Sequence, residues 1–161
     1  MPVPNGMGVF MQAWYRSRAL YDAVMKLVKA GRFEEALKLA SGIPDGNVRS
    51  KAMTGIVVEM ARSGADYREA LERAIETALE TKSSIKNLMG LAFEFMELGK
   101  FEDALYIAEH ITDLPNRSKV QAEVALRLAR RGELERAMKL IEDILDEDVK
   151  TWATSMLASE L

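Results

Sequence analysis

The stretch Gly99-Lys100-Phe101-Glu102-Asp103-Ala104-Leu105 decides the fold, because the chain repeats its pattern three more times. The copies begin at Gly31, Gly64 and Gly132, and each carries an alanine near its middle. These alanines follow one another at intervals of 34, 34 and 33 residues, and they are Ala36, Ala70, Ala104 and Ala137. A fixed period of this length is typical of a stacked helical repeat. The sequence therefore predicts an all-α chain built from repeated helix pairs.

Length and composition indicate one ordinary globular domain. The chain has 161 residues, of which 48% are hydrophobic and 29% charged. Its formal net charge of −3 does not indicate nucleic acid or an anionic membrane as the partner. The absence of cysteine excludes a disulfide framework and a thiol nucleophile, and it fits a cytoplasmic location. The first fifteen residues do not resemble a signal peptide, and no apolar run is long enough to span a membrane.

The repeats predict four antiparallel helix pairs followed by a capping helix. Residues 1–8 contain two prolines and two glycines and are predicted to be a loose lead-in. Residues 9–145 are predicted to hold the four pairs, because a glycine after each first helix ends it and the short links make neighbours antiparallel. Residues 146–161 are predicted to form a helix that covers the exposed end of the stack.

Three aspartates are predicted to cap the helices that follow them. Asp45 and Asp113 lie 68 residues apart in equivalent links, each followed by the sequence Arg-Ser-Lys. Asp146 precedes the last helix. A carboxylate at such a position accepts hydrogen bonds from the free N–H groups of the first helical turn.

At this point the chain resembles the tetratricopeptide repeat (TPR), a helix–turn–helix unit of 34 residues. The Gly-x-Phe-x-x-Ala run matches the turn and the start of the second helix of that unit. Ala92 with Phe95, and Ala125 with Leu128, match the small–large pair of the first helix. The resemblance covers residues 17–145, but the early tryptophan and the closing proline of the strict pattern are missing. It implies a degenerate TPR-like right-handed superhelix that serves as a platform for proteins or peptides.

No residue constellation in the sequence favours catalysis. His110 is the single histidine, and a metal site needs several converging ligands, so it is predicted to be a solvated surface residue. Paired carboxylates such as Glu34 and Glu35 fall in the first turns of helices, where they suit the helix dipole. No Gly-rich phosphate-binding loop follows a strand. The sequence therefore predicts a non-catalytic protein without cofactor or metal.

The first helices of the pairs carry the candidate partner-binding residues. Aligning these helices by their terminal glycines places a basic residue at one equivalent position of each, namely Arg18, Lys51, Lys86 and Lys119. Later turns bring mainly apolar and methionine side chains, of which the candidates are Tyr21, Met25, Met89, Phe93, Met96 and Leu126. In a TPR-like superhelix the first helices line the concave side. The pattern predicts a groove with a basic rim and an apolar floor, suited to an acidic peptide.

Other interpretations stay open at the level of sequence. The floor residues could be core and the basic residues a solvated rim. The chain could be an RNA-binding repeat that contacts phosphates through the basic row, although the net charge and the lack of repeated aromatic platforms disfavour RNA. Self-association through the edges of the stack is a further alternative. The leading prediction is a scaffold that binds a protein or a peptide.

Overall fold

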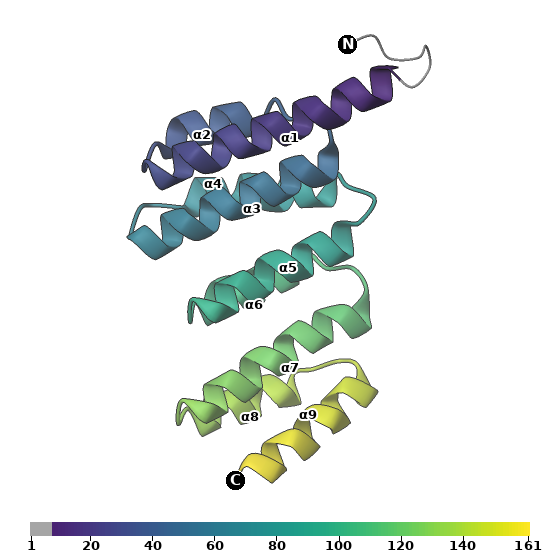
Figure 1. Cartoon of the computed structure of the whole chain (residues 1–161). Coiled ribbons are helices and arrows are strands. Elements are labelled where there is room, and N and C mark those ends of the chain that lie inside the picture. The colour runs from purple at the N-terminus through teal and green to yellow at the C-terminus, as the bar shows by residue number, and fades with distance from the viewer. Residues whose placement is uncertain (1–7) are drawn as a thin grey trace. The chain divides into compact units, whose positions relative to one another are not determined.

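The computed structural model describes residues 8–161, except for the side chains of Val9 and Phe10, and shows nine α-helices and no strand in this range (Figure 1). The predicted all-α class is therefore confirmed, and the predicted lead-in lies outside the described residues apart from Gly8, which begins α1. The helices are α1 (Gly8–Lys29), α2 (Phe33–Ala40), α3 (Gly46–Ser63), α4 (Arg68–Leu79), α5 (Ser84–Glu97), α6 (Phe101–Ala108), α7 (Leu114–Arg130), α8 (Leu134–Glu142) and α9 (Glu147–Glu160).

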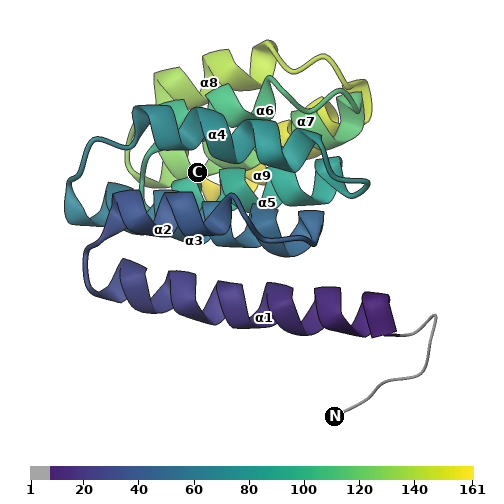
Figure 2. The same cartoon turned by 90° about the horizontal axis from the view of Figure 1, so that it is seen from above.

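The helices fall into two compact units, which are described separately. Unit 1 runs to Asn87 and unit 2 begins at Leu88, so the boundary lies within α5. In unit 1, α1 packs against α2 and α3, and α3 packs against α4; the views in Figures 1 and 2 both show α1 beside α3. In unit 2, α7 packs against α6, α8 and α9. The single-domain organisation and the right-handed course of the whole array stay predictions.

The repeat glycines end the first helices through one recurring turn. Their φ angles of 73° to 86° are the only positive φ values among the described residues. The amide of Gly31 donates to the carbonyl of Val28 at 3.0 Å, and the next amide, of Arg32, donates to the carbonyl of Leu27 at 2.9 Å. The same two bonds recur at Gly64, Gly99 and Gly132. This is the Schellman turn, and its left-handed residue strains any side chain with a Cβ atom.

The hydrophobic pattern predicts second helices over residues 33–43, 101–111 and 134–145, whereas α2, α6 and α8 each end three residues earlier. The chain leaves each of them through a tight turn, in which the amide of Ile43 donates to Ala40 O at 3.1 Å and that of Ile111 donates to Ala108 O at 3.0 Å. The isoleucines that follow these helices are at most 2% exposed, and they are Ile43, Ile111 and Ile144. The apolar pattern therefore continues past the helix end because the turn directs an isoleucine into the core.

The three predicted aspartate caps are confirmed. Each carboxylate accepts the amide of the residue three positions ahead, at 2.9 to 3.1 Å, in the pairs Asp45–Val48, Asp113–Asn116 and Asp146–Val149. These bonds satisfy N–H groups that a helix leaves unpaired at its first turn. The first helices α3 and α7 thus both begin and end at signals that are local in the sequence.

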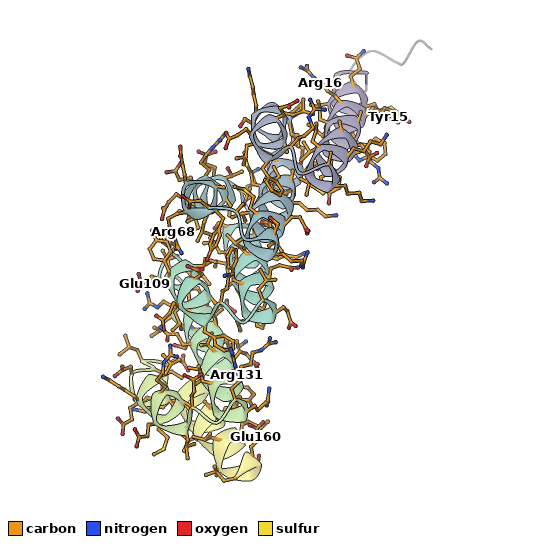
Figure 3. The ribbon with its side chains drawn as sticks, turned by 90° about the vertical axis from the view of Figure 1, so that its left-hand side faces the viewer. Tyr15, Arg16, Arg68, Glu109, Arg131 and Glu160 are labelled. Atoms are coloured by element: carbon orange, nitrogen blue, oxygen red, sulfur yellow. The ribbon has the colours of Figure 1, made fainter. Side chains whose placement is uncertain are left out.

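The last helix covers one end of unit 2, as predicted. It buries Val149, Ala153 and Leu157, and it packs against α7 and α8. Near its end, the carboxylate of Glu160 accepts two hydrogen bonds from the guanidinium of Arg130, at 2.7 and 3.1 Å. This pair raises the pKa of Arg130 above its ordinary value. In Figure 3, Glu160 projects on the side of unit 2 formed by α7 and α9.

Candidate functional site

The four basic residues aligned by the repeat are all exposed: Arg18, Lys51, Lys86 and Lys119. Within the described part of the chain, the structure records no ion pair for any of them. Several exposed arginines elsewhere do pair with a carboxylate, as in Arg32–Glu35, Arg62–Glu59 and Arg136–Glu133. Among the described residues, no acidic side chain therefore forms a direct ion pair with the basic row.

Acidic residues are distributed unequally between the two kinds of helix. The first turns of the first helices contain none, that is, α1, α3, α5 and α7. The first turns of the second helices each contain at least one, that is, α2, α4, α6 and α8. A helix carries partial positive charge at its N-terminus, which acidic residues normally compensate. At α3 and α7 the capping carboxylates of Asp45 and Asp113 offset this partial charge, so the positive character of these helices rests mainly on their exposed basic side chains.

A hollow of about 560 Å³ opens in unit 1 between α1, the link after α2 and the start of α3. It brings together three of the residues that the sequence aligned, Arg18, Tyr21 and Lys51. The Lys51 ammonium lies over the Tyr21 ring, 5.1 Å from its centroid. The other lining residues are Ala13, Trp14, Ser17, Asp22, Pro44, Asp45 and Val48.

Hydrogen bonds fix the floor of this hollow. The hydroxyl of Ser17, which is 1% exposed, accepts the backbone amide of Asp45 at 3.0 Å. The Asp45 carboxylate accepts the amide of Val48 at 2.9 Å. These two bonds tie the link to α1 on one side and to α3 on the other. The polar groups of the floor are thus already paired within the chain.

The residues predicted from the sequence to form the apolar floor of the groove divide into a half-buried group and a buried group. Met25 is half-buried where α1 crosses α3, and a Cβ atom at Gly55 would lie 3.1 Å from the Met25 methyl carbon. Met89 and Phe93 are also half-buried, in unit 2. Met96 and Leu126 are 2% and 1% exposed, so their side chains pack in the core of unit 2 and offer no surface to a partner. For these two residues the structure favours the interpretation in which they belong to the core and not to the floor of a groove.

The sequence alignment missed Trp14. Its side chain is 52% exposed and lines the hollow, and the ring of Tyr15 meets it edge to face with centroids 4.8 Å apart. Trp14 lies four residues before Arg18, on the same side of α1. Extending the alignment of the first helices by one turn toward their N-termini would have found it.

The remaining candidate for site chemistry is His110. Its Nδ1 atom lies 3.0 Å from the backbone oxygen of Tyr106, and its ring packs edge to face on the Tyr106 ring. Among residues 8–161, no group of three or more His, Cys, Asp or Glu side chains is placed to hold a metal ion. In the same range, no helix is both long and apolar enough to cross a membrane.

Comparisons with known proteins add little to this geometry. No protein-family model matches the chain, and no curated protein matches it in sequence. Two solved structures align with it, both of the nearly identical TPR-like repeats of a Podosopora anserina protein described as a kinesin light chain, one of them a variant. Each is 17% identical, with a TM-score of 0.41, over 89% of this chain and 84% of the other. A similarity of this size identifies neither a partner nor an activity.

Proposed function

We propose that the chain is a non-catalytic helical-repeat module that binds an acidic segment of a partner protein at the exposed basic residues of the first helices in unit 1, Arg18, Lys51 and Lys86. One observation carries the proposal: the exposed basic residues at the equivalent position of these helices have no acidic partner in the described chain. Exposed cations without an ion pair contribute little to the stability of the chain, whereas they attract an anionic segment.

RNA is the main competitor, since phosphates also suit a basic row. Salt dependence separates the two ligands, because RNA binding falls log-linearly and steeply as counterions are released. An acidic peptide with apolar contacts loses less affinity over the same range of salt. The absence of catalytic chemistry and the cytoplasmic location are parts of the proposal.

The test uses a fluorescein-labelled peptide of mixed Glu, Asp and Leu residues and a single-stranded RNA of similar length, followed by fluorescence anisotropy. Charge reversal by Lys51→Glu and Lys86→Glu should each weaken peptide binding about tenfold, roughly 1.4 kcal/mol. Lys139→Glu is the matched control, because Lys139 is exposed on the second helix α8 and its reversal changes the net charge by the same amount. Equal losses for all three variants would contradict the proposal, and so would tighter, steeply salt-dependent binding of RNA.

A further inference from the structure

We propose that the hollow between α1 and α3 anchors the partner by taking an aliphatic side chain against Trp14, while a neighbouring carboxylate of the same segment pairs with Arg18 and Lys51. This inference rests on the proposed function. It adds a subsite with its own chemistry, because it requires an apolar residue within the acidic segment. It also assigns a role to Trp14, which lies outside the basic row.

The apolar part of the hollow favours a side chain without hydrogen-bonding groups. Its walls include Trp14, Pro44 and Val48. Two of its polar groups already have partners within the chain, since Ser17 accepts from Asp45 and the Asp45 carboxylate caps α3. A polar side chain buried there would lose hydrogen bonds to water and find few in return.

The exposed side chain of Trp14 can contribute to the binding free energy when a partner covers it. A half-exposed tryptophan beside a hollow offers a large apolar surface at little cost in conformational entropy, and tryptophan is enriched among residues that dominate interfaces. The edge-to-face contact with Tyr15 restrains the indole before any partner arrives. The choice of an aliphatic over an aromatic anchor is part of the proposal, and a peptide with Phe in place of Leu tests it.

The two cations of the hollow, Arg18 and Lys51, favour an acidic residue next to the aliphatic side chain of the bound segment. Arg18 is exposed without an ion pair, and Lys51 is held over Tyr21 with its ammonium directed by the ring. Both cations can therefore meet a carboxylate without breaking a bond of the free chain. Asp22 and Asp45 also line the hollow and repel such a carboxylate. Asp45 is needed as the cap of α3, whereas removing the charge of Asp22 should strengthen binding.

The subsite belongs to the first repeat alone. At the position equivalent to Trp14, counted from the repeat glycines, α3 carries Asn47, α7 carries Pro115, and Lys82 lies in the turn before α5. None of these side chains offers a comparable aromatic surface. An anchor at this repeat fixes the register in which the segment meets the basic residues of unit 1.

The experiment uses tryptophan fluorescence of the full chain carrying Trp152→Phe. Trp152 is the other tryptophan and lies in unit 2, 43% exposed, so the variant leaves Trp14 as the reporter. The probes are capped peptides of sequence Asp-Glu-Leu-Asp-Glu and the versions with Ser or Phe in place of Leu. The Leu peptide should shift the Trp14 emission to the blue and bind about tenfold tighter than the Ser peptide.

Variants separate this inference from the proposed function. In the chain with both tryptophans, with affinities measured from labelled peptides, Trp14→Ala should abolish the difference between the Leu and Ser peptides, and Asp22→Asn should strengthen both. Because Trp14 is exposed, Trp14→Ala should keep the circular dichroism spectrum of the parent. If the peptides bind through Lys51 with equal affinity and unchanged Trp14 emission, the subsite is wrong and the proposed function stands. A Phe peptide that binds tighter than the Leu peptide overturns the aliphatic anchor, and no binding by any acidic peptide overturns both proposals.

Discussion

Substituting Gly132 by alanine tests whether the repeat glycine is present for its backbone conformation. Gly132 has φ +86°, and a Cβ atom built on it meets nothing within 4 Å. Alanine there introduces no clash, so its cost is the left-handed strain of an L residue, about 1–2 kcal/mol, partly offset by the lower entropy of the unfolded chain. We expect a net loss of about 1 kcal/mol, or a fall in Tm of about 2–4 °C for a chain of this size.

Gly90→Ala is the matched control, because it makes the same chemical change in the same unit. Gly90 is exposed within α5, has no φ in the left-handed range, and also has nothing within 4 Å of a built Cβ atom. Alanine is the better helix former, so this variant should gain about 0.5–1 kcal/mol. Urea unfolding followed by circular dichroism measures both. If Gly132→Ala stabilises the chain as Gly90→Ala does, the conformational argument for the repeat glycines is refuted.

Three further variants test the other structural elements. Ile111→Ala should cost about 2–5 kcal/mol in urea unfolding, because this side chain is fully buried after α6. The control Thr112→Ala changes an exposed residue and should alter stability by less than about 0.5 kcal/mol. Equal effects of the two variants would contradict the role of the isoleucine in the core. Asp113→Ala should cost about 1 kcal/mol through the lost cap of α7, while Asp113→Asn should recover most of it; a neutral alanine variant would show that the bond to Asn116 contributes nothing. Glu160→Gln should increase hydrogen exchange in the last turn of α9 at low salt, with the difference from the parent shrinking at 1 M salt, because the pair with Arg130 is largely exposed; a difference independent of salt would indicate lost packing.

The sequence by itself determined the helix pairs and the glycine-marked ends of the first helices. Gly132 predicts the end of α7 because the left-handed residue of a Schellman turn is a local requirement that glycine meets without strain. Asp113 predicts the start of α7 for a similarly local reason, since its carboxylate bonds an amide three residues ahead. Signals that act within a few residues can be read from one chain without knowing what packs against it. The early ends of α2, α6 and α8 could not be predicted from the sequence, because a tight turn and a further turn of helix can both bury an isoleucine.

Only the tertiary structure decided which residues of the candidate site face outward. The helical period placed Met96 and Leu126 on the same stripe as Met89, but packing against other helices buries the first two and leaves Met89 half-buried. The period likewise gave no special place to Trp14, whose hollow exists because the link after α2 passes beside α1. Burial depends on contacts between helices far apart in the sequence. The repeat therefore located the helices, and their packing selected the residues that a partner can touch.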